Sequence, residues 1–214
     1  MLNQETEQIR SQSIATGIAY AELNEFFAKE LMESGYSSMK FLAHEVPLKI
    51  IIRVLKADDL INENRYRLKQ ITSLVKKRLN KDVTILVEMV KDKGLCPNVQ
   101  AEYIRKKMSE GLTYRRAVNG ALRTIKEAGA QGCIIIVSGK LKGQRARSQK
   151  MMWQTNIYSG SPKEEYMREG KSTVHLKQGV IGIIVKIMLP HDPEGIRGPR
   201  REMVDKIRVL DVKE

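Results

Sequence analysis

A row of cations on one face of an expected helix is the most chemically distinctive feature of the sequence. At about 100° per residue, the helix expected over residues 112–128 gathers its polar side chains on one side. They are Arg115, Arg116, Asn119, Arg123 and Lys126. Guanidinium groups bind phosphate oxygens bidentately, so such a face can lie along a nucleic-acid backbone. An ordinary solvated face is the alternative. The absence of a carboxylate before Glu127 favours phosphate contact.

A second basic feature follows in the segment Gly139–Lys150, which holds five cations, two glycines and no carboxylate. The cations are Lys140, Lys142, Arg145, Arg147 and Lys150. Glycine lets backbone amides come close to a phosphate. Because the cations of a bare hairpin would repel one another, the pattern favours contact with nucleic acid. We therefore expect a basic hairpin connection here that binds RNA.

The net charge points to the same class of partner. The chain has 214 residues, a formal net charge of +13 and a pI near 9.7. Residues 96–150 alone carry twelve Lys or Arg against three Asp or Glu. Such an excess favours a polyanionic partner, nucleic acid before an anionic membrane. The apolar run of residues 180–190 is shorter than the roughly 20 residues that a membrane span needs. The polar, acidic N-terminus is no secretory signal, which predicts work in the cytoplasm.

Other site chemistries are poorly supported. His44, His175 and His191 lie far apart, and neither Cys96 nor Cys133 stands at ligand spacing from them, so we expect no metal and no cofactor. No nucleotide-binding glycine loop or hydrolase motif occurs. The sequence therefore predicts a binding protein and not an enzyme.

The first half of the sequence predicts the element order helix, strand, strand, helix, helix, strand. A polar tail, residues 1–15, is expected to be disordered or to lie on a partner, and a helix is expected from Thr16 to about residue 34. Strands are expected over residues 36–43, 48–55 and 83–90, and helices over 57–61 and 66–79. We place this domain at residues 16–93.

The second half predicts two helices and a sheet, after a linker interrupted by Gly94 and Pro97. The helices are expected over residues 99–110 and 112–128, and the strands over 133–138, 151–158, 172–178 and 180–189. We place this domain at residues 94–190. A tail without a core of its own is expected over 191–214, with the adjacent His191 and Asp192 in a turn between prolines.

The polar break between the second and third expected helices of the first domain stands where a KH domain carries its Gly-x-x-Gly loop, which clamps backbone nucleotides. Its residues are Asn62, Glu63, Asn64 and Arg65. Asn accepts left-handed dihedrals, but Arg65 in the second glycine position is strained or forces another loop shape. Glu63 repels phosphate. We therefore expect the first domain to have a KH fold whose nucleotide clamp is impaired. The alternative is that the charge of Arg65 compensates for the missing glycines.

Long stretches of the sequence resemble one protein family. The segments SGKLKGQRARS and KIMLPHDP, within residues 94–150 and 176–195, closely resemble ribosomal small-subunit protein three of the eukaryotic and archaeal type. The segment YAELNEFFAKELMESGYS resembles the first helix of that family's KH domain. The resemblance covers about residues 20–195. The sequence departs from it in the missing Gly-x-x-Gly and in a short tail after Gly195.

The resemblance implies an α+β protein with an N-terminal type II KH domain and a C-terminal two-layer α/β sandwich domain. It implies a structural constituent of the small-subunit head, close to where messenger RNA enters. The implied partners are ribosomal RNA, messenger RNA and neighbouring proteins of the head. The positions matching Arg115 and Arg116 would face the incoming messenger, and residues 140–150 would lie against RNA. A lyase acting on abasic sites and a free regulator of messenger RNA are the alternatives. No single Lys stands out for the first, and the altered KH loop disfavours the second.

Overall fold

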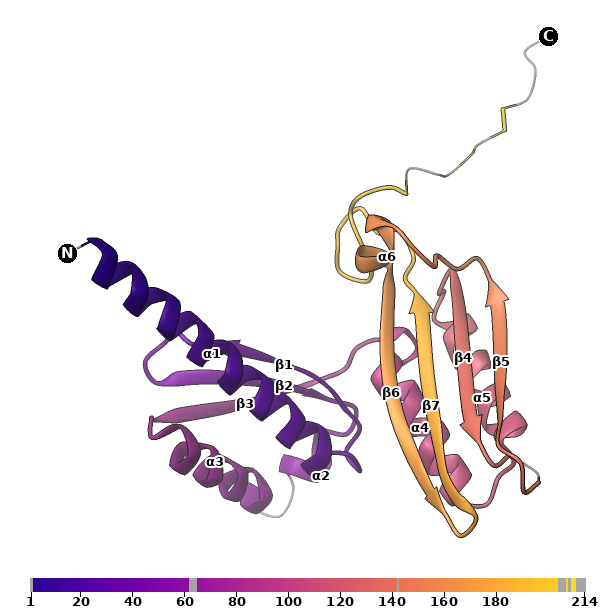
Figure 1. Ribbon diagram of the computed structural model, residues 1–214, viewed down its shortest axis with the longest axis horizontal. Helices are drawn as coiled ribbons and strands as arrows, with labels where there is room; N and C mark the ends of the chain where they lie inside the picture. Colours follow the sequence, from indigo (N-terminus) through magenta and orange to yellow (C-terminus); the bar gives the residue numbers. More distant parts are fainter. Residues whose placement is uncertain (1, 62–64, 142, 204–206, 208, 211–214) are drawn as a thin grey trace. The chain divides into compact units, whose positions relative to one another are not determined.

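The chain divides between Lys91 and Asp92 into two units, each with its own hydrophobic core. The structure is a computed structural model and describes residues 2–61, 65–141, 143–203, 207 and 209–210 (Figure 1). Three residues of the expected KH loop, Asn62, Glu63 and Asn64, lie outside this range, as does Lys142 of the basic hairpin.

The N-terminal unit has the expected order of elements. They are α1 (Leu2–Glu30), β1 (Tyr36–Leu42), β2 (Leu48–Val54), α2 (Asp58–Ile61), α3 (Tyr66–Leu79) and β3 (Val83–Met89). The sheet order is β1-β2-β3, in which β2 pairs antiparallel with β1 and parallel with β3. The parallel pair requires the intervening chain to cross over, and α2 and α3 form that crossover.

One face of this sheet forms the core of the unit. Ile50, Ile52 and Val54 of β2 are buried and alternate with Ile51 and Arg53, which are only half-buried. Other side chains complete the same cluster: Leu23 and Phe27 from α1, Leu31 directly after it, and Ile71 and Val75 from α3. The alternation within the run KIIIRV thus decides which face receives the helices.

The expected start of the first helix at Thr16 is wrong, because α1 begins at Leu2. The first sixteen residues contain neither Gly nor Pro and include several strong helix formers, so nothing interrupts the helix. Thr16 does not cap it. Its hydroxyl instead donates a hydrogen bond of 2.8 Å to the carbonyl oxygen of Gln12, one turn earlier. The stretch expected to be a disordered tail is therefore helical from Leu2.

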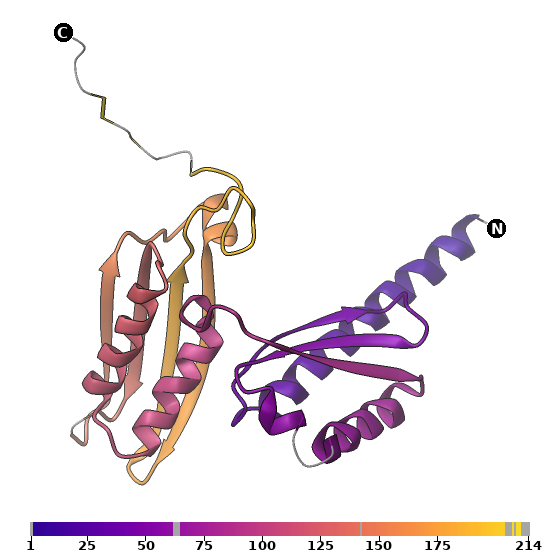
Figure 2. The ribbon, with the colours of Figure 1, turned by 180° about the vertical axis from the view of Figure 1, so that it is seen from behind.

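The C-terminal unit is a four-stranded antiparallel sheet with two long helices on one face (Figures 1 and 2). The sheet order is β5-β4-β7-β6. The elements are η2 (Lys93–Leu95), α4 (Pro97–Ser109), α5 (Tyr114–Glu127), β4 (Gly132–Gly139), β5 (Arg147–Gln154), α6 (Ser161–Tyr166), β6 (Met167–Leu176) and β7 (Gly179–Met188). Sheet and helices form two layers, so the mixed α+β class expected from the sequence is confirmed.

Two strands begin earlier than the sequence suggested. β5 starts at Arg147 instead of residue 151, and β6 at Met167 instead of 172. Both are edge strands, and their first residues are mostly exposed, so they lack the apolar alternation that marks a strand in a sequence. Pairing with β4 and β7 nevertheless satisfies their backbone. The short helix α6 was not expected.

The segment after Pro190 folds into a tight turn. The Asp192 carboxylate accepts hydrogen bonds from the backbone N–H groups of Glu194, Ile196 and Arg197, at 2.8–3.0 Å. The backbone N–H of Asp192 also donates to the Pro199 carbonyl oxygen. None of the described residues beyond Leu189 is buried, as expected for a segment without a core. Hydrogen bonds to one carboxylate therefore hold the turn that the sequence placed at His191 and Asp192.

Close backbone contact between β6 and α4 generates a prediction about stability. A Cβ on Gly170 would lie 2.5 Å from the carbonyl carbon of Pro97 at the start of α4. We expect Gly170→Ala to lower the free energy of unfolding by about 1–3 kcal/mol, because backbone must move to admit the methyl group. The measurement is urea unfolding of the purified protein. The control is Gly143→Ala, where a Cβ would meet nothing within 4 Å; equal stability of the two variants would contradict the prediction.

The turn at Asp192 generates a second prediction. The hydrogen bonds from the backbone of Arg197, Glu194 and Ile196 lower the pKa of Asp192, with desolvation opposing them. The hydrogen bonds therefore stabilise the turn at pH values above the ordinary aspartate pKa of 3.8. This stabilisation is lost as the pH falls through the lower pKa that Asp192 has in the folded protein. At neutral pH, Asp192→Ala should speed hydrogen exchange at the amides of residues 194, 196 and 197. Glu194→Ala, in the same turn, should leave the exchange at 196 and 197 unchanged.

Candidate nucleic-acid interface

Helix α5 separates apolar from basic side chains as the sequence predicted. Tyr114, Ala117, Val118, Ala121 and Ile125 are buried against the sheet. On the other side, Arg115, Arg116, Asn119, Arg123 and Lys126 are exposed. Because burial of the apolar face fixes the rotation of the helix, the cations of α5 are directed outward.

The first turn of α5 is set up for an anion. It contains no acidic residue, and the side chain of Thr113 makes no capping hydrogen bond. The partial positive charge of the helix N-terminus is thus joined by the guanidinium groups of Arg115 and Arg116. Arg115 lies against its neighbour, with Nε donating to the Tyr114 hydroxyl at 3.2 Å. Within the described part of the chain, neither arginine is ion-paired to a carboxylate.

The sheet topology brings the basic hairpin to the same end of the unit. α5 leads through a short connection into β4, which runs back along the helix, so the end of β4 lies near the start of α5 (Figures 1 and 2). Leu141 packs against the hydrophobic core and anchors the loop. A Cβ on Gly139 would lie 3.0 Å from the Val180 carbonyl oxygen of β7, so this glycine permits a close approach. Lys140 and Arg145 are exposed in the loop, and Arg147 is the first residue of β5.

Three of the predicted residues have other neighbours. Arg123 Nε lies 3.1 Å from a carboxylate oxygen of Glu127 on the exposed side of α5. Lys126 Nζ lies 5.0 Å from the centre of the Trp153 ring. Lys150 belongs to the opposite face of the sheet, because it alternates with Met151 and Trp153, which pack on the core beneath the helices. Lys150 Nζ lies there 4.9 Å from the centre of the Tyr158 ring. The structure therefore brings Arg115, Arg116 and the hairpin together, and separates Lys150 from them.

Several further cations near the start of α5 and the β4–β5 hairpin were not predicted from the sequence. Lys106 and Lys107 occupy the last turn of α4, directly before α5, and Lys177 lies in the turn between β6 and β7. Lys107 bonds to Glu110 at 2.8 Å, and this hydrogen bond raises the pKa of Lys107 and lowers that of Glu110. What marks these residues is their position at the ends of helices and strands. This position becomes informative only once the topology of the sheet is known. We call the loop end formed by the start of α5, the β4–β5 hairpin and these neighbouring turns the basic end.

The one described residue of the degenerate KH loop, Arg65, has left-handed backbone angles of φ 59° and ψ 28°. This is the conformation that glycine adopts most easily, so the strain expected for Arg65 at this position is present. Arg65 directly precedes α3, whose first turn holds no acidic residue.

Other chemistries gain no support from the described residues. No helix among them is both long and apolar enough to cross a membrane. They contain no group of three or more His, Cys, Asp or Glu side chains able to hold a metal ion. Burial raises the pKa of the Cys133 thiol to about 11, which suits a core residue and not a nucleophile.

Comparisons with known proteins agree with the fold and the charge pattern. The family described as "Ribosomal protein S3, C-terminal domain" matches residues 104–187, which include α5, the hairpin and most of the sheet. The chain is 47% identical over 212 residues to the small ribosomal subunit protein uS3 of Encephalitozoon cuniculi, and the alignment covers 98% of both chains. Identity at this level over nearly the whole length of both proteins shows common descent. The chain belongs to the uS3 family of small-ribosomal-subunit proteins.

Proposed function

We propose that this protein is a structural constituent of the small-subunit head in the cytoplasm, where it binds ribosomal RNA and contacts messenger RNA as it enters. The observation that carries the proposal is the basic end. There, Arg115 and Arg116 at the start of α5 lie at the same end as the exposed hairpin cations Lys140 and Arg145. Membership of the uS3 family supports the ribosomal part of the proposal.

The geometry suits a strand of RNA better than a small ligand. The cations lie on separate elements of one rigid unit and are exposed, so they can follow successive phosphates. The stripe from Arg116 to Lys126 extends this surface by roughly 15 Å along the helix, at about 1.5 Å per residue. Phosphate contacts of this kind do not depend on base sequence, which is what a protein that meets every messenger requires.

We assign the N-terminal unit a smaller role in RNA binding than the C-terminal unit. Its order of elements, with β2 parallel to β3, agrees with a type II KH domain. A nucleotide clamp would require close backbone approach at the loop that ends with Arg65, and a long side chain there obstructs it. The proposal therefore assigns the main RNA surface to the C-terminal unit. Neither a lyase nor a free regulator is favoured by a particular observation.

The charge of the basic end predicts how salt affects RNA binding. Affinity of the purified protein for a fluorescent single-stranded oligoribonucleotide should fall steeply as salt rises. Replacing both Arg115 and Arg116 with Gln should reduce the log–log slope by about 1.4, or about 0.7 for each phosphate that the protein no longer neutralises. The control is Arg53→Gln with Arg78→Gln, which removes the same charge from arginines paired with Glu88 and Glu22. The same decrease of the slope in both variants would show that only total charge matters.

The proposed position predicts a second result in cells. After a high-salt wash on a sucrose gradient, the tagged protein should remain stoichiometric with the small subunit. Arg115→Glu with Arg116→Glu should reduce translation of messengers with structured leaders several-fold more than translation of unstructured ones. The control, Lys40→Glu with Lys81→Glu, reverses two exposed cations of the N-terminal unit. Free protein at the top of the gradient would refute the ribosomal role, and unchanged translation would refute the messenger contact.

A further inference from the structure

The sheet of the C-terminal unit has a second face that neither long helix of the same unit, α4 or α5, covers (Figure 1). Helices α4 and α5 pack on the other face, through Cys133, Ile135 and Val137 of β4 and their neighbours. On the open face, α6 and the connection before it reach only one end of the sheet. Met188 is fully buried at that end. Further along the strands, Ile136 and Ile184 are only half-buried, and Met152 is 58% exposed.

The side chains on the open face are those of a buried surface. A sheet that faces water on one side normally alternates apolar and polar residues. Instead, β4 reads Cys-Ile-Ile-Ile-Val, so Ile134 and Ile136 place aliphatic side chains on the open face. Ile184 of β7 pairs with Ile136 and continues this apolar strip. β4 therefore has the composition of a strand covered on both faces, whereas β7 places Gly182 and Lys186 beside Ile184 on the open face.

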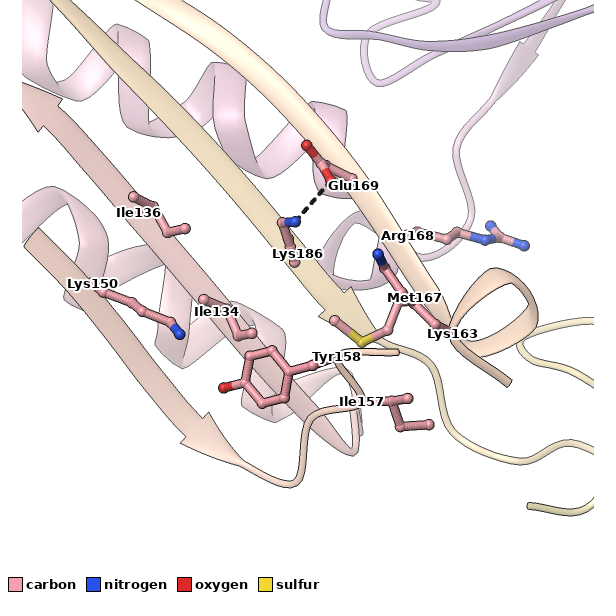
Figure 3. A pocket seen from close by; sticks show the side chains of 10 residues that line it. All are labelled: Ile134, Ile136, Lys150, Ile157, Tyr158, Lys163, Met167, Arg168, Glu169 and Lys186. Carbon is pink, nitrogen blue, oxygen red and sulfur yellow. Dashed lines mark ion pairs between the residues drawn. The ribbon is translucent and has the colours of Figure 1, made fainter. Parts of the chain in front are cut away.

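A hollow of about 190 Å³ lies on this face (Figure 3). Its floor is Ile134, Ile136 and Met167, and Tyr158 and Ile157 border it from the connection after β5. The hydroxyl of Tyr158 lies 3.1 Å from the Met152 sulfur. A volume of this size holds one large side chain.

Lysines surround the hollow. Lys150, Lys163 and Lys186 line it, and Lys171 adjoins it on β6. Glu169 is the one carboxylate in the lining; it lies 3.0 Å from Lys186 and 3.2 Å from Lys171. Lys150 and Lys163 have no carboxylate partner among the residues that the structure describes. Figure 3 shows Arg168 pointing away from the hollow, so it is not counted here.

We propose that this open face docks an acidic segment of another small-subunit protein, with an apolar side chain in the hollow and carboxylates on Lys150 and Lys163. The proposal rests on the proposed function, because it needs the ribosome to supply the partner. Aliphatic side chains match a protein better than RNA, since bases stack on aromatic rings and guanidinium groups. The aromatic ring in the hollow, Tyr158, already has Lys150 beside it, and Glu169 repels phosphate. Lys150 then contacts protein, unlike the hairpin cations.

The size of the face explains why the partner should be sought in assembled subunits. Four strands at about 4.8 Å spacing and eight residues at about 3.3 Å give roughly 500 Å². A stable interface between two free proteins usually buries about 800 Å² on each partner. The contact is thus too small to hold alone, and neighbouring contacts in the subunit must stabilise it.

Photocrosslinking tests the occupant directly. Met152, exposed on this face, is replaced with the photoreactive residue p-benzoylphenylalanine, and purified small subunits are irradiated. We expect an RNase-resistant adduct with another small-subunit protein, at a peptide that carries Asp or Glu near an apolar residue. An RNase-sensitive adduct would identify RNA as the occupant and overturn the proposal. The absence of any adduct, or a crosslinked peptide without acidic residues, would overturn it as well.

A charge reversal separates this proposal from the proposed function. Lys163→Glu with Lys171→Glu should lower the yield of the Met152 adduct several-fold, whereas Lys40→Glu with Lys81→Glu should not. An unchanged yield would contradict the charge complementarity on which the proposal depends. The same gradients report whether the protein sediments with the small subunit. If it does not, the proposed function fails; if it does and the crosslink fails, only the docking proposal is refuted.

Discussion

Strand β4 is the element on which the arrangement of the C-terminal unit depends. It pairs with β5 on one side and with β7 on the other, over nearly its whole length. Burial of Cys133, Ile135 and Val137 fixes which of its faces meets the helices. A slip of one residue would turn these side chains to the opposite face, so the register is strongly determined. Since α5 leads into β4 and the hairpin follows it, this register also fixes where the basic end lies.

The basic end is held together despite its own repulsion. Several cations elsewhere in the described chain have carboxylate partners, as Arg53 and Arg78 do, whereas Arg115, Arg116, Lys140 and Arg145 have none there. The sheet and core keep these charges close, with Leu141 anchoring the loop. Folding therefore leaves a concentration of positive charge that an anion would relieve.

Much of this was predictable from the sequence, and the exceptions have physical causes. The amphipathic pattern of α5 correctly gave its buried face, and β-branched runs gave β2, β4 and β7. The edge strands β5 and β6 began earlier than expected, because hydrogen bonding to a neighbour leaves no trace in local composition. Lys150 was grouped with the hairpin for the same reason. Because the start of the strand was placed four residues too late, Lys150 was taken as part of the connection, whereas it lies within β5 and faces away from the helices.

The two units differ in the features through which each could bind RNA. In a KH domain, the approach of a nucleotide depends on one loop. In the N-terminal unit, Arg65 ends the corresponding segment with left-handed backbone angles and a long side chain. Its charge attracts phosphate, but its bulk prevents the close backbone contact that a clamp requires. In the C-terminal unit, the proposed RNA contacts come from side chains at the ends of helices and strands, so exchanging one residue leaves the rest in place. The proposed RNA surface therefore does not require the glycine loop, but it does require that β4 hold α5 and the hairpin at one end.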